Sequence, residues 1–230
     1  MPRLVIISDT HNQHSLLDLP NGDILIHAGD FSGTGTARQV AAFIEWFSSR
    51  PHPHKVLIAG NHDLTLHEGY YEQMWWRFHR AREDDAAIRA LVEEKQRGGA
   101  LHYLLDREVE AAGLRIYGAP WQPEFCGWAF NLPRGEESAR KWAAIPAGVD
   151  VLVTHGPPLG ALDRLASGER VGCADLAREV FGRVRPRVHA FGHIHESYGV
   201  VDVQGVRCVN ASSCDLGYHI TQPPIVVDLP

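Results

Sequence analysis

The chain of 230 residues lacks the features that identify several classes of protein. Its four cysteines, Cys126, Cys173, Cys208 and Cys214, form no CxxC pair and no zinc-finger spacing, so we expect reduced thiols rather than a disulfide framework or a thiolate zinc site. No apolar stretch approaches the ~20 residues that cross a bilayer. A strand pattern begins by Leu4, which leaves no room for a signal peptide. These absences predict a cytoplasmic protein without a membrane partner.

Basic residues are too few and too scattered to form a surface for polyanions. The chain has 22 lysines and arginines against 28 aspartates and glutamates, a formal charge of −6, and no basic block. Nucleic acid is therefore not an expected partner, because phosphate backbones are bound by clustered positive charge. A hydrophobic fraction of 44% over this length suffices for one well-packed core, so we expect residues 1–230 to form a single domain. Nothing in the sequence predicts an oligomeric state.

What the sequence does contain is a repeated pattern of short apolar runs that end in polar residues. The runs at 5–7, 24–26, 56–59, 151–153 and 188–191 have the length and composition of buried strands. In open α/β sheets, ligands bind in the crevice beyond the carboxyl ends of the strands. The polar residues that follow these runs are Asp9 and His11, then Asp30, then Asn61, His62 and Asp63, then His155, and finally His193 and His195. One strand-end histidine is more often an ordinary hydrogen-bonded residue, but the repetition favours one shared site.

Seven of these residues offer donor atoms that suit metal ions: Asp9, His11, Asp30, Asn61, His155, His193 and His195. Carboxylate, amide and imidazole donors without thiolate suit borderline or hard divalent ions. We expect Mn²⁺ first, with Fe²⁺, Zn²⁺ and Mg²⁺ as alternatives. Seven ligands are too many for one ion, whereas two ions ~3.5 to 4 Å apart that share a carboxylate would use them all. Asp30 is the natural bridge.

The rest of the sequence alternates helix and strand patterns. Thr36 is a predicted N-cap with Gln39 three residues later, and residues 40–47 carry apolar side chains at helical spacing. Residues 64–97 predict a loop and one exposed helix, which Gly98 ends. We further predict a hairpin over 101–117, an ordered aromatic loop over 119–134, helices over 136–142 and 174–184, a hairpin over 198–209 and a strand over 225–228.

The polar motifs form an ordered series: Asp9-x-His11, Gly29-Asp30, Gly60-Asn61-His62-Asp63, Thr154-His155 and Gly192-His193-Ile194-His195. This series resembles the signature of the calcineurin-like metallophosphoesterases. The stretches at 117–123, 127–128, 130–135, 154–160 and 171–173, and the ending at 223–230, resemble the MPPED-type branch, whose members are metal-dependent phosphodiesterases. The sequence pattern alone predicts only an α/β domain. The resemblance implies a four-layer αββα sandwich of two mixed sheets.

The resemblance also implies a role for each of these residues. Asp9, His11, Asp30 and His195 would hold one metal, and Asp30, Asn61, His155 and His193 would hold the other. A hydroxide bridging the two ions would be the nucleophile. His62 would stabilise the developing charge and protonate the departing alkoxide, and Asp63 would hold His62 in place.

Two classes of function stay open at this point. The first is a metal-dependent phosphodiesterase that acts on small phosphodiesters or nucleotides, with cyclic nucleotides as candidate substrates; phosphomonoesterase, protein phosphatase and nuclease activity are its alternatives among enzymes. The second is a low-activity nucleotide-binding scaffold. A scaffold would tolerate the loss of a ligand or of His62, so the complete set favours an enzyme.

The aromatic and proline-rich loop over 121–134 is the expected substrate-selecting wall at the rim of the metal cleft. Phe130, Asn131 and Arg134 are its predicted substrate-binding residues, because an amide and a guanidinium can bind phosphate or base. The alternative is that the aromatic side chains of this loop pack into the core.

Overall fold

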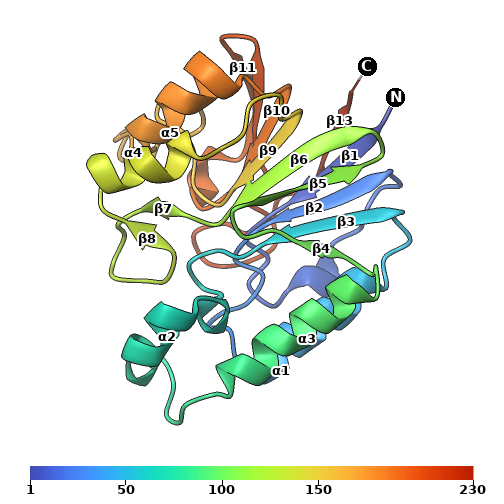
Figure 1. Cartoon of the computed structure of the whole chain (residues 1–230), viewed down its shortest axis with the longest axis vertical. Helices are drawn as coiled ribbons and strands as arrows, with labels where there is room; N and C mark the ends of the chain where they lie inside the picture. The colour runs from blue at the N-terminus through green and yellow to red at the C-terminus, as the bar shows by residue number, and fades with distance from the viewer. Residues whose placement is uncertain (230) are drawn as a thin grey trace.

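Two mixed β-sheets form the centre of the structure, which is a computed structural model and describes residues 1–229 (Figure 1). The first sheet has the order β13-β1-β2-β3-β4, with β13 antiparallel to β1 and all other neighbours parallel. Its strands are β1 (Arg3–Ile7), β2 (Ile24–Ala28), β3 (His54–Ile58), β4 (His102–Tyr103) and β13 (Ile225–Asp228).

The second sheet has the order β11-β12-β10-β9-β6-β5. Its outer pairs, β11 with β12 and β5 with β6, are antiparallel, and the inner neighbours are parallel. Its strands are β5 (Arg107–Ala111), β6 (Leu114–Ala119), β9 (Val151–Thr154), β10 (Val188–Phe191), β11 (Gly199–Val203) and β12 (Val206–Asn210). Two short strands, β7 (Gln122–Pro123) and β8 (Asn131–Leu132), pair with each other outside both sheets.

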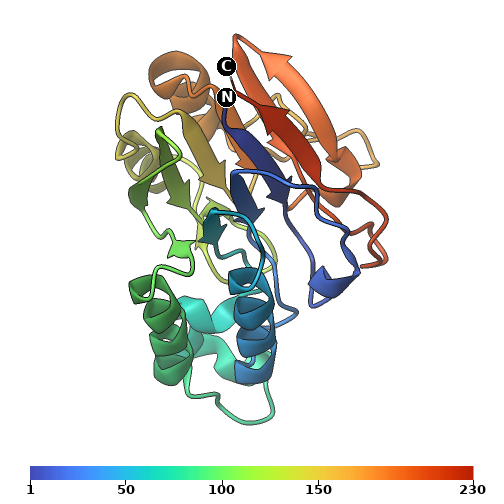
Figure 2. The ribbon, with the colours of Figure 1, turned by 90° about the vertical axis from the view of Figure 1, so that its right-hand side faces the viewer.

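Helices cover the outer face of each sheet. The first sheet packs against α1 (Ala37–Ser48), α2 (Glu68–Met74) and α3 (Asp85–Arg97), which gather below it in Figure 2. The second sheet packs against α4 (Glu136–Ala143) and α5 (Ala174–Arg178), which continues as a π-helical turn over Glu179–Val184. The four-layer αββα arrangement implied by the resemblance is therefore confirmed.

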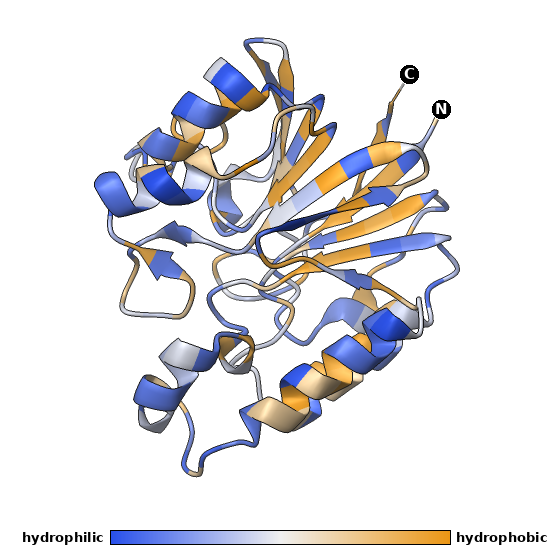
Figure 3. Cartoon of the chain, in the orientation of Figure 1, coloured by the Kyte–Doolittle hydropathy of each residue, from blue (hydrophilic) through white to orange (hydrophobic). Residues whose placement is uncertain are grey.

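Burial on both faces explains why the strands are continuous apolar runs rather than alternating ones. In β1, Leu4 and Ile6 face the opposite sheet, whereas Val5 and Ile7 face the helices. All four side chains are 0% exposed. Figure 3 shows the same apolar character along the central strands. Because successive side chains of a strand point to opposite faces, a polar residue inside these runs would lie in a core.

Most predicted elements are confirmed, including the capping box in which the Thr36 side chain accepts from the backbone of Gln39. The region after Asp63 differs from the prediction. The structure has the additional helix α2, in which only Tyr71 is buried, so its sequence carries too little apolar periodicity to predict a helix. Likewise, β4 joins the first sheet, while the predicted hairpin is confined to β5 and β6 of the second.

Residues 1–229 include no helix with the length and apolar character needed to span a membrane.

Candidate functional site

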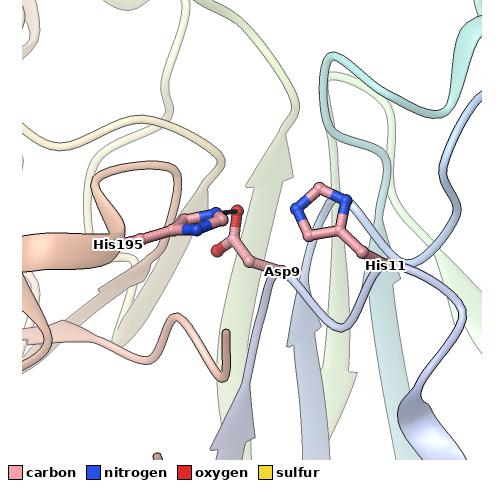
Figure 4. Close-up of side chains that lie close together, drawn as sticks. All are labelled: Asp9, His11 and His195. Carbon is pink, nitrogen blue, oxygen red and sulfur yellow. Dashed lines mark ion pairs between the residues drawn. The ribbon is translucent and has the colours of Figure 1, made fainter. Parts of the chain in front are cut away.

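The ends of five strands from the two sheets bring all seven predicted metal ligands together. Three groups have one donor atom per residue within 4.8 Å of the others: Asp9 with His11 and His195, His11 with Asp30 and His62, and Asp30 with His155 and His193. Asn61 joins them, since its Oδ1 lies 3.0 Å from Nε2 of His155. Figure 4 shows the Asp9 carboxylate between the rings of His11 and His195. The donors thus form one continuous cluster.

The backbone at this cluster is strained. Asp9, His11, Asp30 and His193 have φ values of 51°, 40°, 56° and 69°. Residues with a Cβ rarely adopt this left-handed conformation, and each instance costs on the order of 1 to 3 kcal/mol. Four such residues at one place are typical of a functional site, because the strain persists where a particular side-chain geometry is required.

Two motif glycines allow the carboxylates to approach the loops closely. A Cβ on Gly60 would lie 2.2 Å from Oδ1 of Asp30, and a Cβ on Gly192 would lie 2.0 Å from Oδ2 of Asp9. Any larger residue would displace one of the two carboxylates. This explains why glycine precedes the polar residues after β3 and β10.

Backbone carbonyls orient two of the histidines. Nδ1 of His155 donates to the carbonyl of Ala28 at 2.9 Å, and Nδ1 of His195 donates to the carbonyl of Asp215 at 3.0 Å. Since a carbonyl can only accept, each Nδ1 carries a proton. Nε2 of His155 lies 3.2 Å from Oδ2 of Asp30, and Nε2 of His195 lies 3.3 Å from Oδ1 of Asp9. This arrangement resembles the carbonyl support of metal-binding histidines.

The two buried carboxylates make the cluster a site for positive charge. Burial acts to raise the pKa of Asp9, but the hydrogen bond and charge of His195 hold it well below its usual range. The pKa of Asp30 is likewise lowered against burial, by the charges of His155 and His62. In turn, these carboxylates raise the pKa of His155 and of His195 to about 9, although burial opposes the shift. Positive charge, on a proton or a metal ion, is favoured here.

His11 supplies the clearest test of whether the residues fit a metal ion. Both ring nitrogens of His11 are buried and have no hydrogen-bond partner within residues 1–229. Burial lowers the pKa of His11 to about 4, so the ring is neutral at pH 7 and keeps a lone pair for a ligand. A buried polar group without a partner costs about 1 to 3 kcal/mol. The donor set therefore fits divalent metal ions, one of which would bind the unprotonated ring nitrogen of His11.

The prediction that Asp63 holds the His62 ring is wrong. Asp63 instead joins two loops. Its carboxylate accepts from the backbone amides of Asp30, Gly60 and Ser32 at 3.0, 2.8 and 3.0 Å, and from the Ser32 hydroxyl at 2.6 Å. These four donors come from residues other than His62. Nδ1 of His62 instead donates to the carbonyl of Gly33 at 2.8 Å.

The structure also adds residues that the sequence analysis missed. The Ser212 hydroxyl lies 2.9 Å from Oδ2 of Asp9 and 2.9 Å from Oδ1 of Asn210, so its one hydrogen can go to either oxygen, and Oδ1 of Asn210 also accepts from the amide of Ser212. The ring of Tyr218 lies 4.7 Å from that of His11. Asn210 ends β12, so the pattern of a strand followed by polar residues occurs a sixth time. That pattern could have indicated Asn210 and Ser212. Tyr218 follows no strand and left no such signal.

A cavity of about 290 Å³ opens beside the cluster. Its polar lining includes Asp30, Asn61, His62, His193 and His195. Its walls carry the exposed apolar side chains Phe125, Leu216 and Tyr218, and the charged residues Glu124, Arg134 and Glu196.

Part of the aromatic loop lines this cavity as expected, but two predicted substrate-binding residues do not. Phe130 is 1% exposed and packs against the rings of His67 and Trp121, so the core placement is correct for it. Asn131 turns into the loop, where it donates to the carbonyl of Phe125. Arg134 does line the cavity, although its guanidinium donates to the carbonyls of Gly172 and Val171 at 2.9 and 2.7 Å.

Comparison with known proteins identifies similar chains. A model of the calcineurin-like phosphoesterases matches residues 2–197. The human and the mouse protein named metallophosphoesterase domain-containing protein 1 are each 46% identical over 237 aligned residues, which cover 99% of this chain and 71% of theirs. One solved structure aligns with 91% of this chain and 90% of its own at a TM-score of 0.66. Its identity is 16%, so it supports the fold alone.

Proposed function

The chain belongs to the calcineurin-like phosphoesterase family, and from that premise we propose that it is a phosphodiesterase with two divalent metal ions that hydrolyses small phosphodiesters, with cyclic nucleotides as candidates. The observation that carries the proposal is the cluster of seven oxygen and nitrogen donors beside an open cavity. Strands of both sheets carry the metal-ligand donors, so we treat residues 1–230 as one domain.

We assign Asp9, His11, Asp30 and His195 to one ion and Asp30, Asn61, His155 and His193 to the other. The absence of thiolate from the set favours Mn²⁺ first, with Fe²⁺, Zn²⁺ and Mg²⁺ as alternatives. When bound, such a pair of ions lowers the pKa of water to provide a nucleophile and stabilises charge on the phosphoryl oxygens.

His62 is assigned the proton transfer to the leaving group. The Gly33 carbonyl keeps one proton on Nδ1, so a second proton on Nε2 gives the imidazolium that acts as an acid. The ring lines the cavity, where a substrate oxygen can reach it. Asp63 contributes indirectly, because it fixes the loops that carry Asp30 and Asn61.

Charge around the cavity supports diesters over monoesters. Asp9 and Asp30 are the only carboxylates assigned to the ions, so the loaded centre stays net positive and suits an anion. Glu124 and Glu196 line the cavity with a single arginine, Arg134, and they disfavour each further negative charge on the substrate. A singly charged diester meets less repulsion than a doubly charged monoester.

The test is a substrate panel with Mn²⁺-loaded protein. We expect turnover of bis-p-nitrophenyl phosphate with a kcat/KM above that of p-nitrophenyl phosphate, activity on a cyclic nucleotide, and little on single-stranded DNA. The double variant Glu124→Gln, Glu196→Gln should raise kcat/KM for the monoester and so reduce the preference for the diester. The change removes two negative charges that repel the substrate, and neither residue is a proposed metal ligand.

The variant Glu108→Gln, which changes an exposed glutamate of β5, is the matched control and should behave as the wild type. A higher kcat/KM for the monoester would make a phosphatase the better description. Full metal loading without turnover of any ester would favour the nucleotide-binding scaffold. The negative charge of the chain and its four cysteines without disulfide partners support small substrates and a cytoplasmic location.

A further inference from the structure

The His62 ring stacks on a tryptophan that the proposed mechanism does not use. The ring centroids of His62 and Trp128 are 4.1 Å apart, with an angle of 27° between the planes. His11 meets the same ring edge to face at 4.7 Å. With the Nδ1 hydrogen bond to Gly33, these contacts fix both the plane of the imidazole and its rotation within that plane.

Trp128 is itself held by a segment that has no other role in the site. Its neighbour Gly127 offers a carbonyl that accepts from the Tyr70 hydroxyl at 2.6 Å and from Nη1 of Arg77 at 2.8 Å. The ring of Phe78 lies 4.6 Å from that of Trp128. Tyr70 belongs to α2, and Arg77 and Phe78 follow it, so the polar segment after Asp63 clamps the loop that carries Trp128.

We propose that Trp128 is a positioning residue for His62, and that the segment from Tyr70 to Phe78 holds it in place for that purpose. The proposal rests on the acid role assigned to His62 above. His62 is only partly buried, so without the stacked ring only the Gly33 hydrogen bond and the edge contact with His11 would restrict its rotamer. A displacement of the donor by about 1 Å can lower the rate by roughly 10²-fold.

The step that depends on this geometry is the departure of the leaving group. An oxygen from water forms a bond to phosphorus and its released proton goes to solvent, while the phosphorus–oxygen bond to the leaving group breaks and its electron pair goes to the leaving oxygen. The proton on Nε2 of His62 moves to that oxygen, which leaves as an alcohol, and the imidazole becomes neutral until solvent returns the proton. A nitrophenolate leaves without such help, whereas an alkoxide does not. Loss of positioning should therefore affect the two kinds of diester differently.

The experiment compares Trp128→Ala, Trp128→Phe and His62→Ala on a nitrophenyl diester and on an alkyl diester. For the alkyl diester we expect Trp128→Ala to lower kcat by roughly 10-fold to 10²-fold with little change in KM, since the acid is misplaced but present. For the nitrophenyl diester the loss should be slight. Trp128→Phe, which keeps a stacking ring, should recover most of the activity.

A second readout is coupling. In the double variant Trp128→Ala, His62→Ala, the tryptophan change should add nothing to the loss caused by His62→Ala, because both act on one proton transfer. Trp76→Ala is the matched control: Trp76 lies in the same segment, is 64% exposed and should leave both rates unchanged. Tyr70→Phe removes only the hydroxyl that donates to the Gly127 carbonyl. It should show a smaller loss of kcat, with the same dependence on the leaving group.

Equal losses on both diesters, or additive losses in the double variant, would overturn the proposal and leave Trp128 a packing residue. If Trp128→Ala is unstable in thermal unfolding, Trp128→Phe and Tyr70→Phe decide by the same comparison, and wild-type rates in Tyr70→Phe would count against the clamp. A His62→Ala variant without leaving-group dependence would instead show that the acid assignment is wrong, and the positioning role with it.

Discussion

Replacement of Asp30 by alanine is expected to empty the metal centre and to abolish phosphoester turnover. Asp30 belongs to two of the three donor groups and is 2% exposed, and alanine at this position offers no donor atom to either group. Loss of both ions should lower kcat by roughly 10⁴-fold or more, since metal ions contribute several kcal/mol to such reactions. Elemental analysis should find about two ions per chain in the wild type and far fewer in the variant.

Thermal unfolding gives an independent measurement. A ligand that binds only the folded state raises its stability, so Mn²⁺ should raise the Tm of the wild type but not that of Asp30→Ala. Chelation should abolish wild-type activity and Mn²⁺ should restore it, whereas the variant should stay inactive. Asp202→Ala is the control, because Asp202 is exposed on β11 and pairs only with Arg207 among the ion pairs of residues 1–229. An Asp30→Ala protein that retained two ions and wild-type turnover would refute the dinuclear assignment.

The donor cluster could be predicted from the sequence because each member follows a strand that is buried on both faces. The run before Asp30, for example, has no polar residue before His27. The polar residues that follow such a run lie at the edge of the sheet, where the strand ends. The division into two sheets could not be predicted in this way. Leu4 and Val5 are equally apolar, yet one faces the opposite sheet and the other faces the helices, and nothing in the residues distinguishes the two cores.

The contacts made by individual polar residues were the least predictable part. Asp63 adjoins His62 in sequence, but its carboxylate is bound by backbone amides from two loops, and such donors are the same for every sequence. Phe130 and Arg134 lie four residues apart in one loop, yet only Arg134 reaches the cavity. Their placement depends on how β7 and β8 pair, and two-residue strands carry no periodicity.

Replacement of His62 by alanine is expected to separate chemistry from metal binding. His62 lies within one donor group, but no metal position is assigned to it, so metal content should stay near two per chain while kcat falls by roughly 10²-fold to 10⁴-fold on an alkyl diester. Asn61→Ala, one residue earlier, should instead lose metal, because its Oδ1 lies in the donor cluster beside His155. The two neighbouring variants should therefore differ in elemental analysis even though both are slow.

His54→Ala is the matched control for the loss of an imidazole, since His54 begins the same strand that delivers His62 and lies outside the donor groups. It should keep wild-type kcat and metal content. A His62→Ala protein that lost as much metal as Asn61→Ala would make His62 a ligand, a result that the donor group of His11, Asp30 and His62 permits on geometry alone. Retained metal with an unchanged kcat on the alkyl diester would mean that the alkoxide takes its proton from another donor. In that case Tyr218, whose ring lines the same cavity and lies 6.1 Å from that of His62, becomes the residue to replace next.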